Sequence, residues 1–339
     1  MFRLFLAVYT RKSLHSEDFS LVSLLSFTTQ IKQKIHKEVA MYHLFKCKPK
    51  NIGFFALFLL ILISCVPFTY TQEKQEPKEV ITPEGVRLLK NKSFDDSNQA
   101  RREILELYKD LRLTDVLDAM DLIGLQDIGL MNKNIRPLWR DVDKFSHRIV
   151  GFAITVRHVP TDVRVGQNSF PNLEGFKKFK SEQYKRAPDA WLAVAKPGDV
   201  AVIDAGGIPE CGFIGSNNSL GWAEKGVVGV VTNGGARDTD EIVKVKKIAV
   251  YCKNGYSSRG VRPGRLIAES YNFPINCAGV LVYPGDLVVA DGDGVLVVPR
   301  QRALEVGKIA REINVGDEKS RAGRFKRLGI PLDETVMVK

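Results

Sequence analysis

Short apolar runs separated by turn signals dominate the chain beyond residue 100. Residues 148–158 (RIVGFAITVRH) alternate between apolar and polar positions, as a half-buried strand does. Pro-Gly-Asp turns precede two more predicted strands, 200–204 and 287–290, and an Asp-Gly-Asp-Gly turn leads to a fourth at 295–298. Many short Val, Ile and Leu runs with helices between them predict an α/β or α+β domain with one core, from about residue 95 to residue 315.

Helical spacing of apolar residues marks both ends of this core. Between residues 101 and 111 apolar positions recur three and four apart, and Thr114 is expected to cap a second helix that ends near Gly124. Residues 301–314 form another amphipathic pattern. Residues 315–339 are basic and then irregular, and are expected to form a tail that reaches a neighbouring subunit.

A polar, lysine-rich excursion with spaced aromatic residues interrupts the predicted strands at 160–188. It is expected to be a surface insertion that contains some helix. A role as a lid or as a partner-docking segment is an alternative for the same residues.

The N-terminal part has the pattern of an export signal. Three lysines between residues 46 and 50 precede an apolar run at 52–63. The run ends in Leu-Ile-Ser-Cys at Cys65, which is similar to the bacterial lipobox, where a diacylglycerol is attached to the cysteine. An uncleaved membrane helix over residues 51–72 and an ordinary cleaved signal are the alternatives. All three place the domain outside the cytoplasm, as a membrane-anchored lipoprotein or a periplasmic protein.

These patterns predict five segments. They are an upstream extension without a fold (1–40), a signal peptide or membrane anchor that begins at Met41 (41–65), a tether (66–95), the catalytic domain (96–315) and the tail (316–339).

Composition limits the partners and the metal. The net charge is +11, but the first 65 residues contain nine Lys or Arg and three Asp or Glu, so the remainder carries about +5. The chain has no basic stripe with interleaved aromatic residues, which argues against nucleic acid as a partner. The five cysteines form no Cys-x-x-Cys pair, and only two histidines follow residue 65. A catalytic metal would therefore rely on oxygen ligands, which favours magnesium, calcium or manganese over zinc.

The strongest candidate for chemistry is the stretch 215–238, GSNNSLGWAEKGVVGVVTNGGARD. A turn at Gly215 opens a helical pattern, so the backbone N–H groups of Ser216, Asn217 and Asn218 would lie at a helix start and form a nest for a carboxylate. An apolar strand at 227–232 and a Gly-Gly turn then deliver Arg237 and Asp238 side by side.

Arg237 and Asp238 have the chemistry of a keto-acid site. An arginine at a strand end can fork onto a carboxylate or an enolate oxygen, and the neighbouring aspartate can bind a hard cation. The alternative is structural: an Arg-Asp pair after a strand is commonly a helix N-cap with a surface ion pair, and Asp238-Thr-Asp-Glu also fits an acidic first turn.

Six ordered blocks between about residues 107 and 311 resemble the RraA-like family. This family includes the regulator of ribonuclease activity A, class II aldolases acting on 4-hydroxy-4-methyl-2-oxoglutarate, and oxaloacetate decarboxylases. The resemblance implies an α/β fold, a swivelling-type β/β/α sandwich, and a homotrimer or dimer of trimers with active sites between subunits. The blocks are 114–119, 151–156, 197–200, 226–238, 278–286 and 290–299.

The resemblance also implies roles for individual residues. Asp238 would bind the divalent metal, Mg²⁺ or Mn²⁺, and Arg237 would bind the pyruvate unit of a small 2-keto acid. The amides of Asn217 and Asn218, in the turn that Gly215 permits, would hold its carboxylate. Glu312, on the C-terminal helix, is the candidate for a glutamate contributed by the neighbouring subunit.

Departures from the family pattern affect the predicted reaction, and the 160–188 excursion, longer than the resemblance implies, is a further departure that is expected to reshape substrate entry. The aldolases carry an acidic residue 21 positions before the arginine, where this chain has Ser216, and their usual aspartate at the strand end is Asn233. Serine is a poor base without a partner. Retro-aldol cleavage needs a base for the substrate's hydroxyl proton and decarboxylation does not, so the serine is expected to impair decarboxylation less. A non-catalytic trimeric binding protein is the alternative. A quinone methyltransferase is excluded because Gly206, Gly207 and Gly212 do not form a nucleotide-binding fingerprint that opens a helix.

Overall fold

The computed structural model describes residues 79–81, 87–89, 96–163, 170–206, 208, 211–253, 260–261 and 264–336. The predicted extension, the signal or anchor segment and Cys65 lie outside these residues. Across the described ranges, no helix combines the length and the apolar character needed to cross a membrane.

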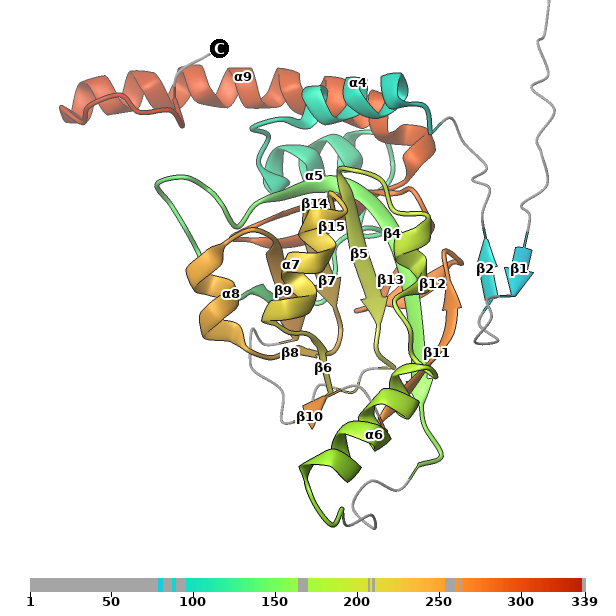
Figure 1. Ribbon diagram of the computed structural model, residues 1–339. Helices are drawn as coiled ribbons and strands as arrows, with labels where there is room; N and C mark the ends of the chain where they lie inside the picture. Colours follow the sequence, from blue (N-terminus) through green and yellow to red (C-terminus); the bar gives the residue numbers. More distant parts are fainter. Residues whose placement is uncertain are drawn as a thin grey trace, which may run out of the picture. The chain divides into compact units, whose positions relative to one another are not determined.

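A mixed ten-stranded sheet forms the framework (Figure 1). Its long central strand is β4, which pairs in parallel with β5 and antiparallel with β11 and β14. From β5 the sheet continues in parallel through β7 and β9, and β3 closes that edge antiparallel. Because β3 comes to lie against β15, the sheet is nearly closed. The strands are β1 (Glu79–Ile81), β2 (Arg87–Leu89), β3 (Ile135–Pro137), β4 (Ile149–Pro160), β5 (Asp199–Asp204), β7 (Gly229–Thr232), β9 (Ala249–Lys253), β11 (Leu266–Tyr271), β14 (Leu287–Asp291) and β15 (Gly294–Val298).

Two smaller sheets complete the strands. One contains β10 (Gly260–Val261), β6 (Cys211–Ile214) and β8 (Gly235–Ala236) in parallel, and the other is the hairpin of β12 (Ile275–Cys277) and β13 (Val280–Val282). The first of these sheets carries the candidate site.

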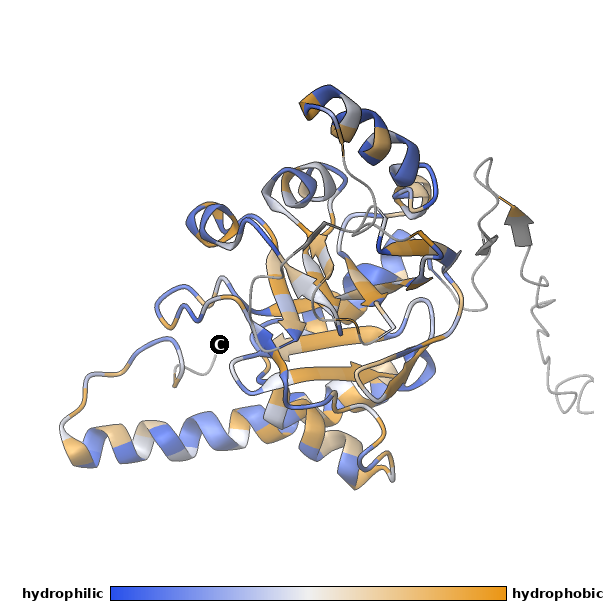
Figure 2. Ribbon diagram, turned by 90° about the horizontal axis from the view of Figure 1, so that it is seen from below, coloured by the Kyte–Doolittle hydropathy of each residue, from blue (hydrophilic) through white to orange (hydrophobic). Residues whose placement is uncertain are grey.

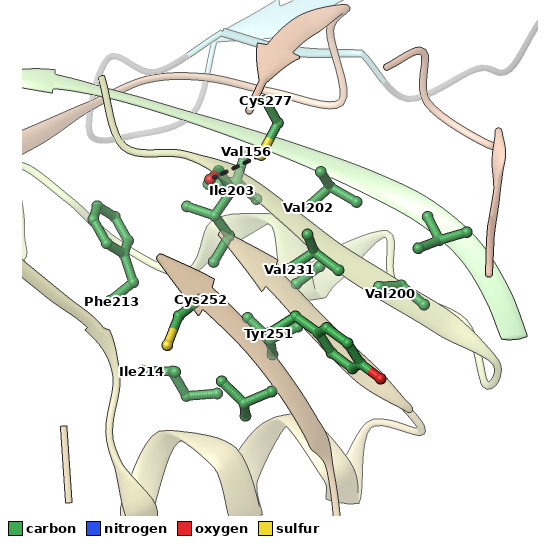
Figure 3. Close-up of a cluster of buried hydrophobic side chains, with 14 of the residues drawn as sticks. Val156, Val200, Val202, Ile203, Phe213, Ile214, Val231, Tyr251, Cys252 and Cys277 are labelled. Atoms are coloured by element: carbon green, nitrogen blue, oxygen red, sulfur yellow. Dashed lines mark hydrogen bonds between the residues drawn. The ribbon is translucent and has the colours of Figure 1, made fainter. Parts of the chain in front are cut away.

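The parallel strands are apolar on both faces, as buried parallel strands are. Every residue of β7 and the first five residues of β5 are buried. Figure 3 shows side chains of β5, β7 and β9 meeting Phe213 and Ile214 of β6. Cys277 belongs to the same core: its Sγ donates to the carbonyl oxygen of Ile203 at 3.7 Å, and burial raises the pKa of its thiol to about 12. It is a packing residue.

Strands β14 and β15 turn one face toward the core described above, and three helices cover the opposite face. These helices are α4 (Asn98–Tyr108), α5 (Leu113–Leu122) and α9 (Ala303–Leu328). Their contact with the sheet is a separate apolar cluster that includes Phe152, Val289 and Leu296. Figure 2 shows the apolar strands and the largely polar second half of α9.

Two helix boundaries differ from the sequence predictions. Helix α5 begins at Leu113 and not after Thr114, because Asp115 accepts a hydrogen bond from the backbone N–H of Arg112 (3.1 Å) and Asp291 accepts one from Leu113 (2.9 Å). Helix α9 continues to Leu328, so the predicted helix end at residue 314 is wrong, and the basic part of the predicted tail is helical. The buried side chains of α9 end at Asn314, and the later turns consist mainly of charged helix-forming residues.

The excursion at 160–188 contains helix α6 (Leu173–Tyr184), as predicted, and α6 has no buried residue. Asn172 caps it by accepting a hydrogen bond from Gly175 N–H at 2.9 Å. The segment after the helix is anchored to the fold, because the carbonyl oxygen of Arg186 accepts a hydrogen bond from Ala268 N–H at 2.9 Å. The excursion is therefore a surface helix with fixed ends.

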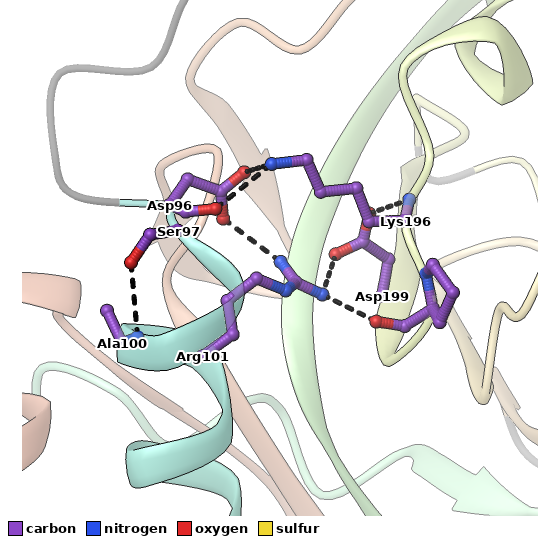
Figure 4. Close-up of polar contacts among 7 residues, drawn as sticks. Asp96, Ser97, Ala100, Arg101, Lys196 and Asp199 are labelled. Carbon is purple, nitrogen blue, oxygen red and sulfur yellow. Dashed lines mark hydrogen bonds and ion pairs between the residues drawn. The ribbon is translucent and has the colours of Figure 1, made fainter.

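A buried ion-pair network fixes α4 to the start of β5 (Figure 4). The Arg101 guanidinium, only 4% exposed, donates to Asp199 Oδ1 at 2.8 Å and to Asp96 Oδ1 at 3.1 Å. Lys196 Nζ lies 2.6 Å from Asp96 Oδ2. Asp199 itself is fully buried, so its charge depends on Arg101 for compensation.

Candidate active site

The candidate site lies where two parallel strands end. Strand β6 is followed by Gly215 and helix α7 (Ser216–Glu224), and strand β8 is followed by Arg237, Asp238 and helix α8 (Thr239–Val245). The two strands are neighbours, and Arg237 N–H donates to the carbonyl oxygen of Ile214 at 2.9 Å. The carboxyl ends of adjacent parallel strands meet at one edge, which is where ligands bind in many α/β folds.

Asp238 turns its carboxylate away from the helix that it precedes. Its backbone is left-handed (φ 52°, ψ 42°), and its side chain makes no capping hydrogen bond to α8. Instead Oδ2 accepts from the backbone N–H of Ser216 at 3.1 Å and lies 3.4 Å from the Ser216 hydroxyl. Asp238 therefore occupies the N-cap position of α8, as the structural alternative predicts, but its carboxylate binds the start of α7 and not α8.

Gly215 makes this contact sterically possible. A Cβ atom at this residue would lie 2.6 Å from Asp238 Oδ2 and 3.6 Å from Cγ of Arg237. The backbone of Gly215 is extended (φ −123°), so any residue could adopt its conformation. The requirement for glycine is the close approach of the carboxylate.

Arg237 and Asp238 also form an ion pair. Arg237 Nε lies 3.4 Å from Asp238 Oδ1, and both side chains are 38% exposed. The surface-ion-pair alternative is thus correct about the contact. The partial exposure also leaves the guanidinium N–H groups and the carboxylate accessible to a ligand.

The structure places Ser216, Asn217 and Asn218 in the first turn of α7, as predicted. The first N–H groups of a helix have no carbonyl partner within the helix, and here Asp238 accepts the one from Ser216. Those of Asn217 and Asn218 lie at the same helix start, and their role in binding a carboxylate stays a prediction.

Asp189 is a residue near this turn that the sequence did not single out. The Asn218 side-chain amide donates to Asp189 Oδ2 at 3.3 Å. Asp189 directly precedes a 3₁₀ turn (Ala190–Ala193), whose Trp191 packs edge-on against Trp222 of α7. No local sequence pattern connects these residues, because 29 positions separate Asn218 from Asp189.

Asn233, which stands where the family usually has an aspartate, has a structural role. Its Oδ1 accepts from Ala205 N–H at 2.6 Å, and its Nδ2 donates to Asp204 Oδ1 at 2.9 Å. It therefore ties the end of β7 to the end of β5, and an amide suits this role because it donates and accepts at once.

Glu312 lies on a different part of the chain from Asp238. It is exposed on α9, whose contacts are with α4 and α5. The structure does not bring it to the site of its own chain, and its contribution to a neighbouring subunit stays a prediction.

The residues present fit a hard cation held mainly by water. Within the described part of the chain, no three His, Cys, Asp or Glu side chains gather as a metal-binding group. Among the described residues, Asp238 offers carboxylate oxygens beside Arg237, and Asp189 offers them beside Asn218. Mg²⁺ commonly keeps several waters and uses one or two carboxylates together with oxygens of the substrate.

Comparison with known proteins identifies relatives over this region. The family model described as RraA-like, Aldolase/RraA, matches residues 113–297. A Halalkalibacterium halodurans protein named "Putative 4-hydroxy-4-methyl-2-oxoglutarate aldolase" is 36% identical over 223 residues, which cover 65% of this chain and 88% of that protein. A Deinococcus radiodurans protein with the same name is 35% identical over 105 residues, 30% of this chain and 61% of that protein.

A solved structure supports the fold. An uncharacterised protein from Pseudomonas syringae pv. tomato superposes with a TM-score of 0.50 at 24% identity, covering 69% of this chain and 92% of that one. At this identity the likeness concerns the mixed α/β fold alone.

Proposed function

Because the chain belongs to the RraA-like family, we propose that it is a divalent-metal-dependent lyase acting on a 2-keto acid that yields pyruvate. Oxaloacetate and 4-hydroxy-4-methyl-2-oxoglutarate are the proposed substrates. The observation that carries the proposal is the left-handed Asp238, whose carboxylate crosses to the start of α7 beside Arg237.

Asp238 is proposed to hold Mg²⁺ or Mn²⁺. Its carboxylate is partly exposed and is fixed in place by Ser216. When bound, the metal supplies Lewis-acid polarisation of the keto oxygen, worth several kcal/mol of transition-state stabilisation.

The chain's own groups bind and orient the keto acid. The amides of Asn217 and Asn218 receive the substrate carboxylate at the positive end of α7. Arg237 donates to the oxygen on which negative charge develops as the enolate forms. Its present contact with Asp238, at 3.4 Å, is long enough for the guanidinium to be shared with a substrate.

Ser216 determines which reaction is favoured. Retro-aldol cleavage requires removal of the substrate's hydroxyl proton, whereas decarboxylation of a 2-keto diacid does not. The Ser216 hydroxyl lies 3.4 Å from Asp238 Oδ2, and a serine without a dedicated base accepts a proton poorly. Oxaloacetate decarboxylation is therefore the proposed main activity.

Pyruvate release tests the proposal. Purified protein is assayed with oxaloacetate and with 4-hydroxy-4-methyl-2-oxoglutarate, each with Mg²⁺ and with EDTA, after subtraction of the Mg²⁺-only background. The proposal predicts Mg²⁺-dependent release that is faster from oxaloacetate and is lost in Asp238→Ala. Release that persists unchanged in EDTA or in Asp238→Ala contradicts it.

A second candidate is a non-catalytic binding protein of the same family. The serine at position 216 favours it, because the proton-handling carboxylate of the aldolases is replaced. Pyruvate that binds in a Mg²⁺-dependent manner, without turnover of any keto acid, would favour this candidate over the lyase.

We also propose the setting in which the site operates. The lipobox-like ending at Cys65 supports export and membrane attachment as a lipoprotein, and the family supports a homotrimer in which Glu312 reaches a neighbour's site. Loss of lipid labelling in Cys65→Ala tests the first proposal, and the mass of the purified particle tests the second.

A further inference from the structure

A cavity of about 800 Å³ is lined by residues other than those of the candidate site. Its lining includes residues of α4, Ile149 at the start of β4, and Gly198 and Val228, which directly precede β5 and β7. Arg237 and Asp238 instead follow the end of β8, and neither lines the cavity. Its volume falls within the range of small-molecule binding sites, roughly 300–1,000 Å³.

The inner wall of this cavity is apolar. Leu105 of α4 is partly exposed there, whereas Ile149 of β4 and Val289 of β14 also line it but are only 1% and 2% exposed. Val228 contributes an aliphatic side chain that is 39% exposed. An apolar wall of this kind stabilises a hydrocarbon group by removing it from water.

One basic side chain in the wall, that of Arg148, has a buried donor without an acceptor. The Arg148 guanidinium stacks on the Phe145 ring, 3.8 Å from its centroid. Its Nε atom is buried without a hydrogen-bond partner, and in the described residues the guanidinium forms no ion pair. Burial lowers the pKa of Arg148, and the charges of Asp291 and Asp110 oppose that shift. A buried donor without an acceptor is unfavourable, so an anion in the cavity would complete this site.

The loop that carries Phe145 is held in a fixed conformation. Asp141 accepts hydrogen bonds from the backbone N–H of Lys144 (3.0 Å) and from the Ser146 hydroxyl (2.6 Å). These contacts lower the pKa of Asp141 to about 2. Phe145 has a left-handed backbone (φ 51°), which is an uncommon conformation for a bulky residue. The stacked pair is therefore preformed.

Charges around the opening favour an anion. Glu106 and Lys109 lie 3.9 Å apart and compensate each other. Arg102 and Lys144 are exposed cations that also line the cavity. With Arg148 they exceed the remaining carboxylate, Asp110.

We propose that this cavity binds a small organic carboxylate with an apolar body. The carboxylate forks onto Arg148, and the hydrocarbon chain lies against Leu105 and Val228. This site is separate from the keto-acid site, and its ligand differs in having a long apolar part.

Octanoate is the probe, with 1-octanol and acetate as partial probes that keep only the chain or only the charge. Isothermal titration of the whole protein is expected to show saturable binding of octanoate, with at least tenfold weaker binding of each partial probe. Arg148→Gln is expected to weaken octanoate binding about tenfold, as loss of a charge-assisted hydrogen bond does. Arg324→Gln, which removes the same charge from an exposed position on α9, is expected to leave it unchanged.

A second variant, which fills the cavity, tests the proposal even if Arg148→Gln does not fold. Val228→Trp places a large ring in the cavity from a partly exposed position and should abolish octanoate binding, with no loss of melting temperature. Asp238→Ala should leave octanoate binding unchanged, which separates this inference from the proposed lyase. The proposal is overturned if octanoate shows no saturable binding, as it would if a second copy of the chain covered the cavity. Equal binding to Arg148→Gln, or loss of binding in Asp238→Ala, also overturns it.

Discussion

The carboxylate of Asp238 accepts a hydrogen bond from the backbone N–H of Ser216 at 3.1 Å, although the two residues are 22 positions apart in the sequence. The contact joins the helix start after β6 to the residue that follows β8. It gives the N-terminus of α7 a carboxylate that its own N-cap residue, Gly215, cannot supply. One carboxylate thus orients the first turn of a helix and is also the proposed metal ligand.

Gly215→Ala tests the close approach that this contact needs. The added methyl group would lie 2.6 Å from Asp238 Oδ2, so the carboxylate must move. We expect Mn²⁺ affinity and pyruvate release to fall at least tenfold, with a change in unfolding free energy of about 1 kcal/mol or less, because an exposed carboxylate moves more easily than the core. Gly221→Ala is the matched control. It lies in the same helix with no atom within 4 Å of the new methyl group, and it should keep activity and stabilise α7 by roughly 0.5–1 kcal/mol.

Ser216→Asp tests the missing proton acceptor. A carboxylate at this position should raise the rate of retro-aldol cleavage relative to decarboxylation, because only the first reaction needs a hydroxyl proton removed. Pyruvate release from the two substrates is measured in parallel and expressed as a ratio. Ser216→Ala, which removes the hydroxyl without adding an acid, should leave that ratio unchanged. An equal ratio in Ser216→Asp and wild type would mean that this position does not select the reaction.

Arg101→Met tests the network between α4 and β5. The variant leaves the buried Asp199 carboxylate without its cation, and such a change destabilises a protein by roughly 3–5 kcal/mol. Urea unfolding measures the effect. Arg102→Met, next to it but exposed, should change stability by less than about 0.5 kcal/mol. A double variant, Arg101→Met with Asp199→Leu, should recover part of the loss; a loss as large as in the single variant would argue against the uncompensated charge as the cause.

His147 makes stability depend on pH. It is buried, and its Nδ1 accepts the backbone N–H of Asp141 at 3.1 Å, which requires a neutral ring. Burial, together with Arg148 and Arg140, lowers the pKa of His147 below its ordinary value of 6.5. The unfolded chain therefore binds a proton that the folded chain does not. The contribution of His147 is present above pH 6.5 and declines as the pH falls below that value.

Melting temperatures between pH 7.5 and pH 5.5 check this prediction. His147→Asn keeps a hydrogen-bond acceptor for Asp141 but does not titrate, so the decline should be smaller in this variant. Identical slopes in both proteins would assign the pH dependence to other groups.

The sequence predicts the local parts of this structure and misses the long-range ones. The strand patterns at 148–158, 200–204 and 295–298 each match an observed strand to within two residues, because alternation and continuous apolar runs are local signals. The predicted Gly-Gly turn before Arg237 and Asp238 is only partly correct, because Gly235 forms a second short strand, β8, in another sheet. The length of α9 was missed because its second half has no apolar stripe.

The sequence does not predict the contacts between residues that are far apart in the chain. The Arg101–Asp199 pair spans 98 positions, and the left-handed backbone of Asp238 follows from its contact with Ser216. The cavity around Arg148 gathers residues from five separate stretches of the chain, none of which carries a recognisable motif. These features depend on how the elements pack, which a single sequence does not encode locally.

The central claim is that Asp238 and Arg237 bind a metal and a keto acid together. Mn²⁺ binding, followed by electron paramagnetic resonance with and without pyruvate, tests it most directly. The account predicts that pyruvate tightens Mn²⁺ binding to wild type and to Asp240→Asn, an exposed aspartate two residues further on. It predicts little Mn²⁺ binding to Asp238→Asn, and Mn²⁺ binding to Arg237→Gln that pyruvate no longer strengthens. Mn²⁺ binding to Asp238→Asn as tight as to wild type would contradict the account.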